Sequence, residues 1–194
     1  MTNSRFLTFF FLLLIVPGIL LTSCIKAGED DPAISLRSRK SRMAGKWKVT
    51  RVNYSSIWDR IPVYVSRKIK FENGVFTYNS YSKDIGLQET RIDTSGNYEW
   101  NIEFSRSGSY DNLLMINGSK REVNGTWEFA SRDSINISSI GFLTDAGFFR
   151  ELIPFFYQGK YYIKQLRHDK IVFFANNDFS GGELVNMEIV LEPQ

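Results

Sequence analysis

The feature that most constrains the fold of this chain is an alternation of apolar and polar residues with a period of two. It is clearest between positions 97 and 104, where Tyr98, Trp100, Ile102 and Phe104 alternate with Asn and Glu residues. Successive side chains of a β-strand point to opposite faces, so this pattern predicts a strand with one buried and one solvated face. The chain also holds sixteen Phe, nine Tyr and four Trp, a composition that favours strands over helices.

Turn-forming residues separate further segments with the same period. Asn73-Gly74 is the strongest of these signals, because Asn-Gly is favoured in two-residue hairpin turns. Further turns are predicted at 94–96, 107–109, 117–119 and 131–133. We therefore expect about eight to ten antiparallel strands in an up-and-down arrangement, and closure into a barrel would leave no long edge exposed.

Two details of parity refine this prediction. The apolar positions change parity between Val49 and Val52, which indicates a bulge near Thr50-Arg51. Between positions 63 and 71, the apolar residues share one parity, and Arg67 falls among them.

Two segments interrupt the strand pattern. Asp31-Pro32 is typical of a helix start, and the apolar residues that follow predict a short helix ending near Ala44-Gly45. From about 140 to 160 the aromatic residues fit helical spacing until Pro154. We expect this insert to cap one end of the barrel, with Phe149 and Phe156 as candidate gate residues. The alternatives are ordinary core residues or an exposed aromatic patch.

The first 23 residues indicate a bacterial secretion signal. Arg5 precedes an apolar run, Phe6 to Val16, that is too short to span a membrane. The run leads to Leu21-Thr22-Ser23-Cys24, which resembles the lipobox of bacterial lipoproteins. This resemblance implies cleavage before Cys24, acylation that palmitate would label, and an anchor in the outer membrane, on its periplasmic side or at the cell surface. The alternative is an ordinary signal peptide with a chance cysteine.

The predicted organisation therefore has three parts. Residues 1–23 form the signal peptide, residues 24–43 the lipidated cysteine, tether and short helix, and residues 44–194 the barrel. Residues 32–51 contain seven Lys and Arg residues and no acidic residue, so this stretch could lie against anionic lipid head groups. The alternative is a solvated helix face followed by a strand. The net charge of +3 is too small to indicate a nucleic-acid partner.

A family resemblance starts at Gly45-Lys46-Trp47, which follows the predicted helix and begins the first strand. This motif resembles the Gly-x-Trp opening of the lipocalins, and the later hairpins around residues 124–137 and 162–174 are similar to those of bacterial lipocalin-like lipoproteins. The resemblance implies a lipocalin-like barrel in which Trp47, with Gly45, closes one end. No arginine partner of Trp47 can be assigned; Arg150 and Arg167 are candidates by position alone.

Catalytic chemistry finds little support in the sequence. A single His and a single Cys argue against a disulfide scaffold, a Cys/His zinc site and a Ser-His-Asp triad. His168 falls in a predicted tight turn, where a solvated histidine is expected. Glu99 and Glu103 would lie about 13 Å apart along one strand, too far for a carboxylate pair acting on one bond. We expect a non-enzymatic protein with no cofactor and no metal ion.

The barrel interior is the remaining candidate site. Eight residues are predicted to point inward: Phe76, Tyr78, Tyr98, Trp100, Ile102, Phe104, Trp127 and Phe129. They would either fill the barrel or line a cup for one small hydrophobic molecule. The first case leads to a structural or adaptor lipoprotein that binds an unknown protein or glycan partner through its loops. The second leads to a non-catalytic binding protein, and the sequence slightly favours it.

Overall fold

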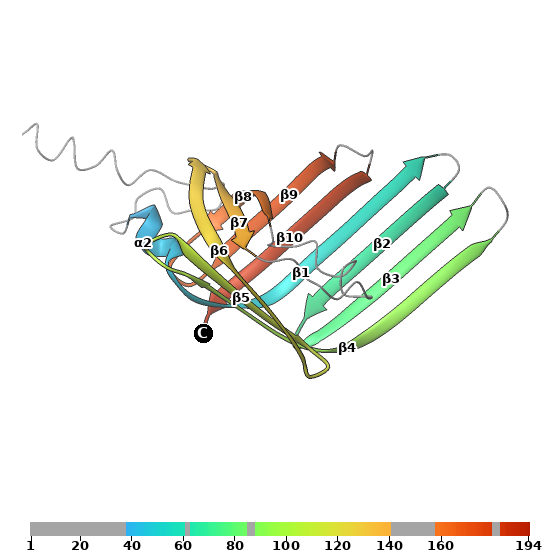
Figure 1. Cartoon of the computed structure of the whole chain (residues 1–194), viewed down its shortest axis with the longest axis horizontal. Coiled ribbons are helices and arrows are strands. Elements are labelled where there is room, and N and C mark those ends of the chain that lie inside the picture. Colours follow the sequence, from blue (N-terminus) through green and yellow to red (C-terminus); the bar gives the residue numbers. More distant parts are fainter. Residues whose placement is uncertain (1–37, 61–62, 85–87, 141–157, 180–182) are drawn as a thin grey trace, which may run out of the picture.

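The computed structural model describes residues 38–60, 63–84, 88–140, 158–179 and 183–194. These residues form one short helix and ten strands (Figure 1). The elements are α2 (Arg39–Met43), β1 (Gly45–Arg60), β2 (Val63–Glu72), β3 (Val75–Asp84), β4 (Glu89–Phe104), β5 (Ser109–Ile116), β6 (Ser119–Ser131), β7 (Ser134–Ile140), β8 (Gln158–Leu166), β9 (Ile171–Phe179) and β10 (Glu183–Pro193).

The strands form a closed, antiparallel, up-and-down barrel. Each strand pairs with its neighbour in sequence, and β1 pairs with β10 to complete the ring. The predicted all-β barrel is therefore confirmed. Strands β1 and β4 are the longest at 16 residues each, and they also pair directly from Gly45↔Phe104 to Lys48↔Asn101. The hairpin of β2 and β3 fills the space between β1 and β4 only at the other end of the barrel.

This double pairing gives the barrel two unequal ends. Near α2, the direct pairing of β1 with β4 narrows the ring. We call this end of the barrel the closed end. Away from α2, the second half of β1 pairs with β2, and the first half of β4 pairs with β3. Figure 1 shows these parts of β1 to β4 side by side and extending beyond β5, β6 and β7. We call this extension of β1 to β4 the long wall.

The predicted hairpin turn at Asn73-Gly74 is confirmed. Both residues have positive φ, 53° and 77°, as a type I′ turn requires. Asn117-Gly118 adopts the same conformation, with φ values of 49° and 81°. The bulge expected near Thr50-Arg51 is confirmed too, because the register of β1 against β10 shifts between Val49 and Arg51.

The turn predicted at 94–96 is wrong. These three residues lie inside β4, where Thr94 pairs with Tyr78 and Gly96 with Phe76. A Thr-Ser-Gly sequence resembles a turn when read alone, but here the backbone hydrogen bonds to β3 determine the conformation. Gly96 also lies so close to Asn117 that an added Cβ would come within 2.2 Å of its Oδ1 atom.

The predicted short helix ends as expected, because α2 stops at Met43 and Ala44 is its C-cap. It begins later than predicted, at Arg39, where the Ser38 side chain accepts a hydrogen bond from the Ser41 amide as the N-cap. Asp31-Pro32, Cys24, Phe149 and Phe156 lie outside the described residues. The ends of the predicted helical insert are strand, since Ile140 belongs to β7 and residues 158–160 belong to β8. In the described ranges, no helix is long and apolar enough to cross a membrane.

Candidate ligand-binding site

The closed end of the barrel is covered by α2. Trp47 is buried, and its indole Nε1 donates a hydrogen bond to the carbonyl oxygen of Met43 at 2.9 Å. The neighbouring Arg42 is 5% exposed, and its Nη1 donates to the carbonyl oxygen of Leu166 at 2.6 Å. A buried arginine near this end therefore comes from α2. Of the two candidates by position, Arg167 is exposed, and Arg150 lies outside the described residues.

Aromatic side chains fill the interior next to the closed end. The ring centroid of Phe71 lies 4.9 Å from that of Tyr98 and 5.4 Å from that of Trp100. The ring centroid of Phe104 lies 5.6 Å from that of Trp127 and 6.4 Å from that of Phe173. Centroid distances of this size are those of edge-to-face aromatic packing. This half of the barrel is a packed core.

The eight residues predicted to point inward all belong to this interior or its edge. Seven are at most 8% exposed: Phe76, Tyr78, Tyr98, Trp100, Ile102, Phe104 and Trp127. Phe129 is partly buried, and the guanidinium carbon of Arg39 lies 4.1 Å from its ring centroid. These side chains pack on one another, and contact of any of them with a ligand stays a prediction.

Two polar side chains inside the core have hydrogen-bond partners. The indole Nε1 of Trp100 donates to Oδ1 of the buried Asn112 at 2.6 Å. The Tyr98 hydroxyl donates to the carbonyl oxygen of Thr50 at 3.1 Å, at the position of the bulge. Burial of this hydroxyl raises the pKa of Tyr98, because the phenolate would lose its water.

The long wall continues the inner face of the barrel beyond this core. Directly paired residues of antiparallel strands share one face, so the pairings define rows across β1, β2, β3 and β4. The two inner rows are Val52, Phe71, Phe76, Gly96 and then Tyr54, Ile69, Tyr78, Thr94. The next two are Ser56, Arg67, Ser80, Ile92 and then Trp58, Val65, Ser82, Thr90. Side-chain chemistry changes sharply between the second and third rows.

The exposure of the large apolar side chains increases along the same direction. Ile69 and Tyr78 in the second row are 1% and 0% exposed. Two rows farther out, Trp58 is 40% exposed, while Ile92 in the third row is 45% exposed. The third row also brings Arg67 between Ser56 and Ser80 on adjacent strands. The long wall thus presents partly exposed apolar side chains and one guanidinium group on the face that lines the core.

The sequence pointed to only part of this arrangement. Arg67 on an apolar parity was a visible signal, since an arginine at a buried-face position is unusual. Trp58 gave no such signal, because the bulge and the pairing with Val65 are needed to assign it to the inner face.

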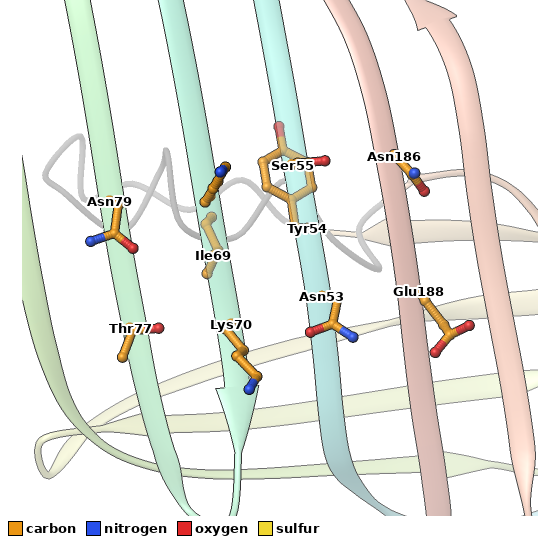
Figure 2. A pocket seen from close by; sticks show the side chains of 10 residues that line it. Asn53, Tyr54, Ser55, Ile69, Lys70, Thr77, Asn79, Asn186 and Glu188 are labelled. Carbon is orange, nitrogen blue, oxygen red and sulfur yellow. The ribbon is translucent and has the colours of Figure 1, made fainter.

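A hollow of about 460 Å³ lies on the opposite, outer face of the same strands. Figure 2 shows Glu188, Asn53, Lys70 and Thr77 at this hollow, one from each of the neighbouring strands β10, β1, β2 and β3. Glu188 is held by Nη2 of Arg51 at 3.2 Å and by Nζ of Lys164 at 3.4 Å. The hollow is open, and most of the residues that line it are polar, as expected for the solvated face of a sheet.

The basic residues predicted to face lipid have intramolecular partners in several cases. Arg39 contacts Phe129 and donates to the carbonyl oxygen of Ser131, and Arg42 donates to that of Leu166. Lys46 pairs with Glu103 at 3.6 Å. These contacts support the alternative interpretation, a helix face followed by a strand. They argue against a basic surface that is available to lipid head groups.

The candidates for acid-base chemistry are dispersed. His168 is exposed, as expected for a residue in a tight turn, and Glu99 and Glu103 lie on the exposed face of β4. Among the described residues, no group of three or more His, Cys, Asp or Glu could hold a metal ion.

Comparison with solved structures gives two weak matches. A lipocalin-like protein from Bacteroides uniformis is 10% identical, with 79% of this chain and 99% of that chain covered and a TM-score of 0.42. Rv2717c from M. tuberculosis is 11% identical, with 79% and 94% covered and a TM-score of 0.26. No family model and no curated protein matches the sequence. The barrel assignment therefore rests on the strand pairing of this chain.

Proposed function

We propose that this protein is a non-catalytic binding protein of the bacterial cell envelope, which holds a small apolar molecule against the inner face of the long wall. The observation that carries the proposal is Trp58. This tryptophan is 40% exposed although it belongs to the same face as the buried Tyr54. Exposure of a large aromatic side chain costs free energy in water, and a bound apolar molecule would recover it.

The partners of Trp58 on the wall support the same function. Trp58 is directly opposite Val65, and Ile92 lies in the next row inward. Trp58 and Val65 together offer an apolar surface, while Tyr54, Ile69 and Tyr78 form a buried floor two rows farther inward. A ligand would therefore lie on the floor and would not penetrate the core. This shifts the expected ligand contacts from the deep aromatic residues to the long wall.

Fluorescence provides a direct test, because Trp58 is the most exposed of the four tryptophans. Trp47, Trp100 and Trp127 are at most 4% exposed. We expect 1-N-phenylnaphthylamine to bind and to protect Trp58 from acrylamide quenching. The Trp58→Phe variant should lose the part of the tryptophan fluorescence that the dye protects from quenching. Dye binding without protection of Trp58 would place the ligand elsewhere, and absence of dye binding would contradict the proposed function.

A second candidate is a structural or adaptor lipoprotein, which the packed closed end favours. A barrel whose core is filled by rings such as Phe71, Trp100 and Phe104 needs no ligand for stability. Its exposed loops would then bind a protein or glycan of the envelope. Failure of the dye to bind would favour this candidate.

The proposed location is the outer membrane, with Cys24 as the lipid anchor. The support is the lipobox-like Leu21-Thr22-Ser23-Cys24, which contains the only cysteine of the chain. Metabolic labelling with palmitate should mark the wild-type protein, and Cys24→Ser should remove the label and shift the protein to the soluble fraction. An unlabelled wild-type protein would contradict the anchor.

A further inference from the structure

The outer face of the barrel carries asparagines that strand formation does not explain. Asn53, Asn79 and Asn186 belong to β1, β3 and β10, and all three line the outer hollow of about 460 Å³ (Figure 2). Asparagine is depleted in strands, because its amide competes with the backbone for hydrogen bonds. Three asparagines around one hollow therefore indicate a role beyond the stability of the sheet.

The polar groups at this hollow are accessible to a ligand. Asn53 and Asn186 are exposed, and neither side chain makes a hydrogen bond within the described part of the chain. The amide of Asn79 donates to Oδ1 of Asp93 at 2.7 Å, which fixes its orientation. Lys68 adds an exposed ammonium group. Because each amide has a carbonyl acceptor and an NH₂ donor, the hollow presents both kinds of group on neighbouring strands.

Most charges around the hollow are compensated within the protein. Lys70 pairs with Glu72. The carboxylate of Glu188 lies 3.2 Å from Nη2 of Arg51 and 3.4 Å from Nζ of Lys164, so it is held in place as a hydrogen-bond acceptor. This arrangement favours a neutral ligand whose groups both donate and accept hydrogen bonds.

An exposed aromatic side chain extends the same row of the outer face. Phe174 on β9 is directly opposite Glu188 on β10, and Glu188 is directly opposite Asn53 on β1. Phe174 is 37% exposed although it stacks on Tyr162, with 5.3 Å between the ring centroids. Exposure of an aromatic ring costs free energy in water, and a ligand with an apolar face would recover part of it. Aromatic surface and hydrogen-bonding groups thus lie in one row.

We infer that this outer face binds a neutral oligosaccharide, with one sugar ring on Phe174 and the following units along Glu188 and Asn53 toward Asn79. Sugar hydroxyl groups both donate and accept hydrogen bonds, which matches the amides and the carboxylate of the hollow. The C–H groups of a sugar ring can pack against the negative face of an aromatic ring. This site lies on the opposite face from the long-wall site and does not depend on the proposed function.

The strand arrangement sets the length and the class of the ligand. Adjacent strands lie about 4.8 Å apart, so the row from β9 to β3 spans about 19 Å, which requires a chain of several sugar units. An extended peptide would need a free strand edge, but β10, β1, β2 and β3 are each paired on both sides.

Titration calorimetry with four neutral tetrasaccharides tests the inference: cellotetraose, maltotetraose, mannotetraose and chitotetraose. We expect at least one of them to bind with a dissociation constant below about 1 mM. The corresponding disaccharide should bind at least about tenfold more weakly, because it cannot reach from Phe174 to β3. Absence of binding by all four would overturn the inference, and so would tighter binding of the anionic tetragalacturonate. None of the sugars should displace 1-N-phenylnaphthylamine, so failure here leaves the proposed function intact.

Variants of the row locate the site. Asn53→Ala and Phe174→Leu should each weaken binding of the tetrasaccharide about tenfold, because they remove an amide and an aromatic ring, whereas Phe174→Tyr should retain it. Asn136→Ala is the matched control, because Asn136 is an exposed asparagine of β7 that does not line the hollow. Unchanged affinity in Asn53→Ala and Phe174→Leu would overturn the inference. Asn53→Ala truncates an exposed side chain, so it decides the outcome if Phe174→Leu fails to fold.

Discussion

Arg42 is the buried charge on which the closed end of the barrel depends most directly. Its Nη1 donates to the carbonyl oxygen of Leu166 at 2.6 Å, and the side chain is almost fully buried. Arg42→Ala would leave that carbonyl without this donor, and we expect a loss of about 2 to 3 kcal/mol in the free energy of unfolding. Lys40→Ala, on the exposed side of the same helix, should cost less than about 0.5 kcal/mol. Urea unfolding measures both, and equal losses would contradict the role of Arg42.

Tyr98 predicts a pH dependence of stability. Burial raises the pKa of its hydroxyl above the ordinary value of 10.0. The unfolded chain therefore loses this proton at lower pH than the folded chain does. The contribution of the protonated Tyr98 hydroxyl to the free energy of unfolding is fully present below about pH 10. It is lost as the pH rises through the pKa of Tyr98 in the folded state.

The comparison with Tyr98→Phe isolates this contribution. At about pH 8 the variant should be about 1 kcal/mol less stable, because the hydrogen bond to Thr50 is lost. Between about pH 10 and pH 11 the difference should narrow, since only the wild type has the Tyr98 proton to lose. Urea midpoints across this range provide the measurement. A difference that stays constant with pH would show that the hydroxyl is not perturbed by burial.

Among the elements, the β2–β3 hairpin shows how much the conformation of one turn matters. Gly74 has a φ of 77°, where any residue with a Cβ is strained. Gly74→Ala should therefore destabilise the protein by about 1 to 2 kcal/mol. Asn73→Gly, at a φ of 53°, removes a side chain from a similar conformation and should change stability by only a few tenths of a kcal/mol. Comparable losses in both variants would mean that side-chain contacts, not φ, stabilise this turn.

The strands of this barrel differ in how well the sequence reveals them. The second half of β4 alternates strictly around Trp100, so its pattern alone predicts a half-buried strand. The first half contains Ile92 as its one large apolar residue and ends in Thr94-Ser95-Gly96, which resembles a turn. Only pairing with β3 makes this segment a strand. Local patterns therefore predicted the core strands, whereas the long wall depends on partners far apart in the sequence.

The same distinction applies to the candidate site. Residues such as Trp100 and Phe104 were predicted to face inward because they belong to the apolar parity of the 97–104 segment. Whether they fill the barrel or surround a cavity depends on how two distant strands approach, as in the contact of Phe104 with Phe173. No periodicity within one strand carries that information. The same holds for Ser56, Arg67 and Ser80, which are brought together by the register of three strands.

In the whole molecule, core packing and ligand binding are expected to belong to opposite ends of the barrel. In the core next to the closed end, Phe71 is fully buried and lies against Tyr98 and Trp100. Phe71→Ala should therefore cost about 3 to 5 kcal/mol by creating a cavity. On the long wall, Trp58 is 40% exposed. Trp58→Ala should cost about 1 to 2 kcal/mol, less than Phe71→Ala, because part of the Trp58 side chain already lies in water.

Dye affinity should respond in the reverse order. Measured under conditions where each variant is folded, binding of 1-N-phenylnaphthylamine should weaken strongly in Trp58→Ala and stay within a few-fold of wild type in Phe71→Ala. The reason is that the packed floor of Tyr54 and Tyr78 separates Phe71 from the proposed ligand. Thermal melting and dye titration on the same preparations measure the two effects together. A large stability loss in Trp58→Ala with unchanged dye affinity would make Trp58 a core residue, and the long wall would then have no role in binding.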